Sequence, residues 1–264
     1  MKRFLFTLLL LAQTITAQAA AFAHANWDAL LKKHVVSIQN GQATQVDYDG
    51  MMKDRAQLKR YLSATSNVIR TTFDDWSKEE QLAFLINAYN AWTVELILSG
   101  YPNIESIKDL GSFFQSPWKK AFIPLLGETR SLDDIEHGLI RGSGRYNDPR
   151  IHFAVNCASI GCPALRPDAY LAEKLDQQLD EATRLFLSDR TRNRRENDTL
   201  YVSSIFKWYR ADFEHGWRGA ESLEQFLSLY SNPLSLDGTA QRLLLSGSMD
   251  VEFLAYNWRL NRTD

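Results

Sequence analysis

The sequence contains little cysteine: only Cys157 and Cys162 occur among 264 residues. Structural zinc sites normally use two close pairs of ligands, so one C-x4-C spacing is a weak signal for zinc. An excess of charge is also lacking, because 30 Lys and Arg stand against 32 Asp and Glu, a formal net charge of −2. This balance gives no reason to expect a nucleic acid or a membrane surface as partner. Repeats, low-complexity tracts and linkers are absent too, which favours a single domain.

The N-terminus has the pattern of a secretory signal peptide. Lys2 and Arg3 precede an apolar run over residues 4–12, and small residues follow up to Ala20. We expect residues 1–20 to be removed by cleavage after Ala19 or Ala20. Residues 21–264 then form an exported, soluble globular domain, periplasmic or secreted, without a transmembrane segment. A bacterial lipid anchor is not expected, because no cysteine lies near the cleavage site.

Apolar periodicity predicts an α+β fold that is mostly helical and packed around a small β-sheet. Ser77 and Glu80 have the spacing of a capping box, and the helix that they start, 78–99, is apolar almost all round, which is typical of a central buried helix. The other expected helices fall within residues 24–70, 131–141, 169–187, 206–213 and 221–230. The expected strands are a hairpin over 122–130, a buried strand over 151–157, a strand over 199–202 and a terminal strand over 251–258, with a basic loop over 190–198.

Two amides in the central helix need partners. Asn87 and Asn90 are three residues apart and lie on one face of the helix. A buried amide without partners costs about 1–3 kcal/mol. The pair therefore indicates a polar surface inside the fold, either a site or a structural network.

The stretch over residues 148–163 concentrates the chemistry of the chain. It holds both cysteines together with His152 and Asn156. In a regular strand, alternation directs His152 and Asn156 to one side and Cys157 to the other, unless the strand bends at its end. The small residues that follow Cys157 are compatible with such a bend.

A second histidine, His137, follows Asp134 by three residues and precedes Arg141 by four. An imidazole oriented by an acid is typical of a general base. An exposed histidine near a helix cap is the alternative.

Three chemistries fit these residues. In a thiol-dependent acyl-transfer or hydrolase enzyme, Cys157 is the nucleophile, His152 or His137 the base, and Asn87 or Asn156 the orienting group. In a non-catalytic binding or scaffold protein, the same side chains form a polar core beside a Cys157–Cys162 disulfide, whose loop of six residues contributes about 2 kcal/mol. The third is a thiol-redox site, or a zinc site that adds His152 and His137 to the cysteines. We assign no cofactor, and the ligand is an unidentified small molecule or peptide.

Several motifs in order resemble one known family. They are residues 84–91, 131–137, 148–163, 205–209 with Asp212 and Phe213, and 253–258. Over about residues 40–264 the chain is similar to the domain of unknown function 547 (DUF547) family, as an exported bacterial-type member. The resemblance implies that the following residues share one constellation: Asn87, Asn90, His137, His152, Asn156, Cys157 and Cys162.

The family resemblance also bears on the fold and the thiols. A central helix followed by a strand that bears a histidine is similar to papain-like and transglutaminase-like folds, which carry their cysteine where this chain has Asn87 or Asn90. Intracellular members with the same two cysteines imply more than a structural disulfide, because reducing compartments rarely preserve one.

Overall fold

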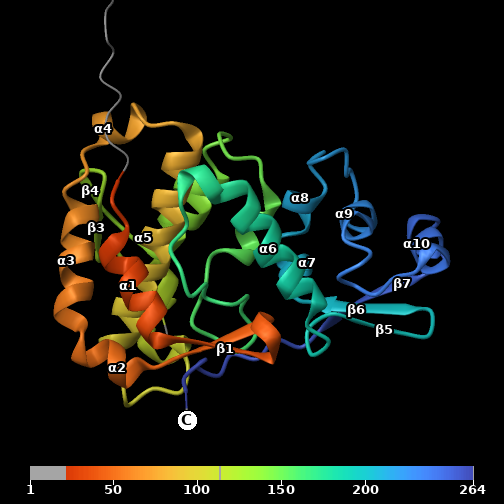
Figure 1. Ribbon diagram of the computed structural model, residues 1–264, viewed down its shortest axis with the longest axis horizontal. Helices are drawn as coiled ribbons and strands as arrows, with labels where there is room; N and C mark the ends of the chain where they lie inside the picture. Colours follow the sequence, from red (N-terminus) through yellow and green to blue (C-terminus); the bar gives the residue numbers. More distant parts are fainter. Residues whose placement is uncertain (1–21, 113, 264) are drawn as a thin grey trace, which may run out of the picture.

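The computed structural model describes residues 22–112 and 114–263, so the predicted signal peptide lies outside the described residues. Helices dominate and strands are few and short, which confirms the predicted α+β class (Figure 1). The α-helices are α1 (Ala25–His34), α2 (Tyr48–Lys53), α3 (Arg55–Ser66), α4 (Arg70–Asp74), α5 (Lys78–Leu98), α6 (Leu175–Ser188), α7 (Ile205–Trp208), α8 (Arg210–Phe213), α9 (Leu223–Leu229) and α10 (Gly238–Leu245). The other helical segments are the π-helix η4 (Asp134–Arg141) and the 3-10 helices η1 (Gln39–Gly41), η2 (Ile107–Leu110), η3 (Pro117–Lys119), η5 (Pro149–Phe153) and η6 (Ala172–Lys174).

The strands of the described residues form three small sheets. β1 (Val35–Ile38) pairs with β2 (Ala43–Val46), and β3 (Ile123–Leu125) pairs with β4 (Glu128–Arg130), both antiparallel. The largest sheet has the order β5-β6-β7, formed by β5 (Arg194–Glu196), β6 (Thr199–Ser203) and β7 (Asp250–Leu254). β6 is antiparallel to β5 and parallel to β7, so residues 250–254 return alongside residues 199–203.

Helix α5 is the central element, as its sequence predicts. Ser77 accepts a hydrogen bond from the Glu80 amide while the Glu80 carboxylate accepts one from the Ser77 amide, which is the predicted capping box. The helix is buried along nearly its whole length within a hydrophobic cluster built from α1–α5 and the segments up to Leu179. Its all-round apolar surface is thereby explained.

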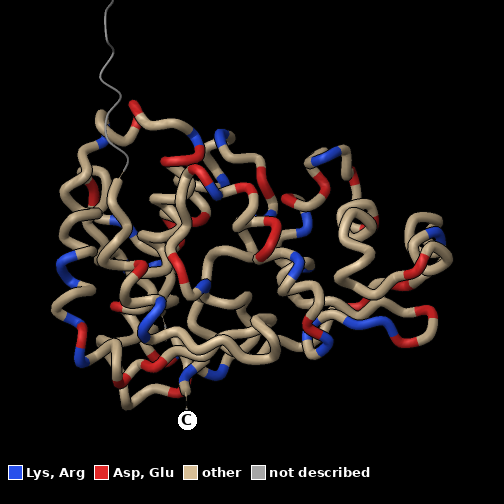
Figure 2. Tube along the Cα trace, in the orientation of Figure 1, with Lys and Arg blue, Asp and Glu red and all other residues tan. Residues whose placement is uncertain are grey.

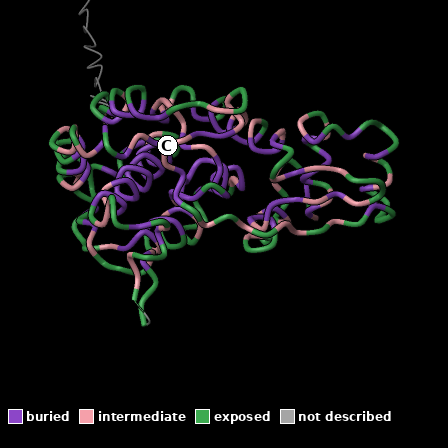
Figure 3. Tube along the Cα trace, turned by 90° about the horizontal axis from the view of Figure 1, so that it is seen from below, coloured by how far each residue is buried: buried purple, intermediate pink, exposed green. Residues whose placement is uncertain are grey.

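A second hydrophobic cluster lies in the narrower part of the molecule. Apart from Phe153, its members come from α6 to β7, and buried segments lie there apart from the broad body around α5 (Figure 3). Element η5 connects the clusters, because Ile151 packs into the first and Phe153 into the second.

The strand predicted over 151–157 is wrong. Asp148 accepts a hydrogen bond from the Arg150 amide, Pro149 occupies the first turn, and the chain forms the 3-10 helix η5. Residues 154–156 then run irregularly to a turn. A short apolar run buried on all sides does not reveal its own period, and proline at the first helical position favours a helical start.

Smaller differences concern bonding pattern and extent. The helix predicted over 131–141 is present as η4, but it is a π-helix and not an α-helix. At its end the Gly142 amide donates to the carbonyl of His137, five residues earlier, at 2.8 Å. Part of the predicted basic loop forms β5, β7 ends earlier than predicted, and helix α10 has no counterpart in the sequence-based prediction.

Charges of both signs are interspersed along the described chain (Figure 2). Within the described residues, every helix is too short or too polar to span a bilayer.

Candidate functional site

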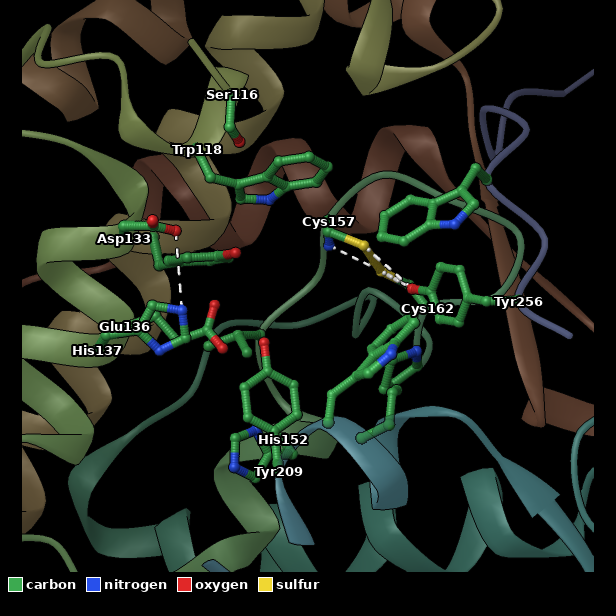
Figure 4. A pocket seen from close by; sticks show the side chains of 16 residues that line it. Ser116, Trp118, Asp133, Glu136, His137, His152, Cys157, Cys162, Tyr209 and Tyr256 are labelled. Atoms are coloured by element: carbon green, nitrogen blue, oxygen red, sulfur yellow. Dashed lines mark hydrogen bonds and ion pairs between the residues drawn. A yellow bond between two sulfur atoms is a disulfide. The ribbon is translucent and has the colours of Figure 1, made fainter. Parts of the chain in front are cut away.

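A cavity of about 190 Å³ lies where the two hydrophobic clusters meet. Its described lining is Tyr89, Ser116, Trp118, Asp133, Glu136, His137, His152, Val155, Cys157, Cys162, Pro163, Ile205, Trp208, Tyr209, Tyr256 and Trp258. Figure 4 shows Asp133, Glu136 and His137 on one side and the two cysteines with Tyr256 on the other. These side chains come from η4 and the residue before it, from the loop after η5 and from the segment after β7.

Cys157 and Cys162 form a disulfide in the cavity wall. The Tyr256 hydroxyl lies 3.1 Å from the sulfur of Cys157 and 3.1 Å from that of Cys162. The Cys157 amide also donates to the Cys162 sulfur at 2.9 Å, and the carbonyl of Cys162 accepts a hydrogen bond from Arg192. The Cys162 residue is buried, whereas Cys157 is partly exposed.

His152 belongs to a buried charged network. Its Nε2 lies 2.7 Å from Oδ2 of Asp212. The same carboxylate accepts two hydrogen bonds from Arg141, one at each oxygen, at 2.5 and 3.0 Å. Burial alone raises the pKa of Asp212, but the hydrogen bonds from His152 and Arg141 outweigh it and hold that pKa well below its usual range. Burial lowers the pKa of His152, although Asp212 opposes this.

A defined tautomer of His152 follows from this network. The imidazole is neutral and Nε2 carries the proton, because an ionised carboxylate only accepts hydrogen bonds. Its Nδ1 is then an unprotonated acceptor, and that atom is buried without a hydrogen-bond partner among the described residues. The ring stacks on Tyr209 with centroids 4.0 Å apart.

His137 has the same tautomer as His152 but differs in having a partner at Nδ1. Its Nδ1 lies 2.6 Å from Nη1 of Arg141, and a guanidinium only donates, so Nδ1 accepts. The proton is therefore on Nε2, which lies 3.7 Å from a carboxylate oxygen of Asp133. Arg141 thus fixes both His137 directly and His152 through Asp212.

Two carboxylates form the acidic side of the cavity. Burial raises the pKa of Asp133, and His137 partly opposes this. Glu136 is only 5% exposed. The phenols of Tyr89 and Tyr209 lie beside its carboxyl group, and burial together with this carboxyl raises the pKa of both phenols.

An aromatic cluster completes the wall, and we call Trp118, Trp208, Tyr256 and Trp258 the ring cluster. Trp258 contacts all three other rings, with centroids 4.4 Å from Tyr256 and 5.7 Å from each of the other tryptophans. Lys108 places its ammonium 3.7 Å from the centre of a Trp258 ring.

The structure distributes the predicted site residues between the cavity and its supports. His137, His152, Cys157 and Cys162 line the cavity. The other predicted residues bind backbone. Asn87 bonds the backbone of Tyr170, Asn90 bonds Ala154 and Asn156, Asn156 bonds Ala158 and Pro163, and Asp134 bonds Ser131 at the start of η4.

Sequence reasoning missed several residues of the site. Asp212 lies 60 positions from His152, and Tyr256 lies 99 positions from Cys157. Both stand inside motifs of the family resemblance, which was the one available signal. Glu136 directly precedes His137 and was read only as part of that motif.

One family model matches part of the chain. Residues 73–187 match the model described as "Protein of unknown function, DUF547". The match supports the DUF547 family. This DUF547 segment supplies both cysteines, both histidines and the two carboxylates of the cavity, while Asp212, Tyr256 and two tryptophans come from outside it.

No curated protein and no solved structure matches the chain. The similarity to papain-like and transglutaminase-like folds therefore stays a prediction.

Proposed function

We propose that the cavity is an active site for thiol–disulfide exchange and that Cys157 and Cys162 are its reactive pair. The observation that carries the proposal is the hydroxyl of Tyr256, which lies 3.1 Å from both sulfurs on a cavity wall. Burial raises the pKa of Tyr256, so the phenol keeps its proton and donates it in a hydrogen bond. A donor in this position stabilises a thiolate that forms when the disulfide opens.

The exchange has two steps. A substrate thiolate attacks the sulfur of Cys157, the more exposed of the two residues, and a mixed disulfide forms as the bond to Cys162 breaks. The Cys162 thiolate leaves toward the Tyr256 hydroxyl. A second substrate thiolate attacks the substrate sulfur of the mixed disulfide and releases the substrate disulfide. Two electrons pass to the protein, whose two thiolates take up the protons that the two substrate thiols lost.

Acyl transfer by Cys157 has weaker support. Among the described residues, the hydrogen-bond partners of its sulfur are the Tyr256 and Ser159 hydroxyls, and neither histidine is one of them. A thiol nucleophile needs a base within reach. For zinc, the described residues contain no cluster of three His, Cys, Asp or Glu side chains that could hold an ion.

Export remains part of the proposal. The N-terminal pattern of a basic start, an apolar run and small residues supports it. An oxidising compartment would keep the pair closed between reactions.

The test is the accessibility of the disulfide in folded protein. We expect mercaptoethanol to open it without denaturant, so that alkylation and intact-mass measurement find two new thiols. In a Cys162→Ser variant, Cys157 should form a mixed disulfide with a small disulfide faster than Cys162 does in the matched Cys157→Ser variant. If the pair opens only after unfolding, the exchange proposal is wrong and the disulfide is structural.

A further inference from the structure

The described lining of the cavity contains carboxylates but no lysine or arginine. The carboxylates are those of Asp133 and Glu136. Arg141, which stands behind this side, uses its donors on Asp212 and His137. Lys108 lies over Trp258 and is outside the lining.

Glu136 shows the imbalance most sharply. The residue is 5% exposed, and the neutral phenols of Tyr89 and Tyr209 lie beside its carboxyl. Among the described residues, Glu136 has no ion pair with Lys, Arg or His. Arg141 and His152 lie near enough to act on its charge but form no ion pair with it. Burying a carboxylate without a direct ion pair is costly, so a cation that enters the cavity is bound favourably. Figure 4 shows this carboxyl on the side of the cavity opposite the cysteines.

The ring cluster favours the same kind of ligand. Organic ammonium groups bind over the faces of Trp and Tyr rings, because the faces carry partial negative charge. Trp258 already holds the Lys108 ammonium 3.7 Å from a ring centre. Trp208, in the same cluster, is 47% exposed and so remains accessible.

We propose that the thiol substrate is a small organic cation, an aminothiol whose ammonium group binds on the side of Asp133 and Glu136 while its sulfur meets Cys157. This inference rests on the proposed exchange function. The placement follows from the cavity itself, since the carboxylates and the disulfide face each other across it (Figure 4). A volume of about 190 Å³ admits a molecule of a few heavy atoms and excludes a folded protein.

The first experiment compares three thiols of similar size: cysteamine, which is cationic, mercaptoethanol, which is neutral, and mercaptopropionate, which is anionic. Rates of disulfide opening are measured at low ionic strength, and each is divided by the rate at which the same thiol opens a small uncharged disulfide in solution, because thiolate concentration and intrinsic nucleophilicity both differ among the three thiols. We expect cysteamine to react about tenfold faster than mercaptoethanol, which corresponds to about 1.4 kcal/mol, and mercaptopropionate to react slowest. Equal normalised rates for the three thiols overturn the inference and leave the exchange function standing.

Two charge-removing variants test whether Asp133 and Glu136 cause the preference for the cationic thiol. Glu136→Gln and Asp133→Asn keep the side-chain size and remove one charge each. We expect each to reduce the ratio of the cysteamine rate to the mercaptoethanol rate, whereas the matched control Glu252→Gln, at an exposed position of β7, keeps the ratio of the unaltered protein. A ratio that both cavity variants leave unchanged contradicts the assignment.

A non-thiol probe separates the two proposals. Choline is titrated into the oxidised protein and followed by tryptophan fluorescence, beside the neutral alcohol in which a tert-butyl group replaces the trimethylammonium group. If no thiol opens the disulfide, the exchange function fails; choline binding that Glu136→Gln weakens then still supports the cation site. Equal binding of the two probes, or no binding, overturns the cation site.

Discussion

At the scale of single residues, the thiol chemistry depends on Tyr256. Its hydroxyl contacts both sulfurs, while its ring packs against Trp208 and Trp258 with centroids 4.9 and 4.4 Å away. A phenylalanine in this place retains the ring contacts and removes only the donor. The contribution of the hydroxyl is therefore measurable by itself.

We predict that Tyr256→Phe slows opening of the disulfide by mercaptoethanol about tenfold or more, because a hydrogen bond to a charged group is worth about 1.5–3 kcal/mol. Timed alkylation followed by mass spectrometry measures the rate. The control is Tyr201→Phe on β6, a partly exposed tyrosine that does not line the cavity. Equal rates in the two variants would show that the hydroxyl does not assist the leaving thiolate.

At the scale of elements, α5 carries two buried asparagine side chains, and one of them holds the backbone of the cavity wall in place. Asn90 donates to the Ala154 carbonyl at 2.9 Å and accepts from the Asn156 amide at 2.8 Å, directly before Cys157. One turn earlier, Asn87 makes the equivalent pair of bonds with the backbone of Tyr170, at 2.8 and 3.0 Å. The two side chains thus have the same chemistry and different targets.

We predict that Asn90→Ala and Asn87→Ala each lower the free energy of unfolding by about 2–4 kcal/mol, because each leaves two buried backbone groups without partners. Urea denaturation measures this. Only Asn90→Ala should alter the rate of disulfide opening, since only Asn90 holds the loop before Cys157. An equal change in both variants would mean that general destabilisation, and not the loop anchor, governs the rate.

Local sequence patterns predicted several of these elements correctly. Residues 77–99 carry their own cap and apolar surface, so α5 was predictable, and the hairpin β3–β4 and α6 were too. The segment at 149–153 was not, because Pro149 and the Asp148 cap competed with an apolar run that reads as a strand. The choice depended on the two hydrophobic clusters that η5 connects.

At the scale of the whole molecule, buried histidines couple stability to pH. Burial lowers the pKa of His24 from 6.5 to about 4, with Asp28 opposing, and Nδ1 of His24 lies 2.8 Å from the Tyr61 hydroxyl. Burial also lowers the pKa of His152. A histidine whose pKa is lower in the folded state favours the unfolded state on acidification, because the unfolded chain binds the proton first.

We predict that the free energy of unfolding is highest above pH 6.5 and falls as the pH drops from 6.5 toward 4, with His24 contributing about 3 kcal/mol of the loss. Urea denaturation across this range measures the slope. His24→Gln should flatten it, whereas replacement of the exposed His215 by Gln should not. If His24→Gln leaves the slope of the unfolding free energy against pH unchanged, the pH dependence arises from other groups.

The sequence by itself determined the helical character of the chain, the start of α5 and the concentration of sulfur and imidazole between residues 148 and 163. These features depend on neighbours within a few positions, where spacing and capping act directly. Only the tertiary structure decided what His152 and Cys157 contact. Asp212 and Tyr256 reach them from 60 and 99 positions away, because the meeting of two hydrophobic clusters closes those loops and no local pattern records it.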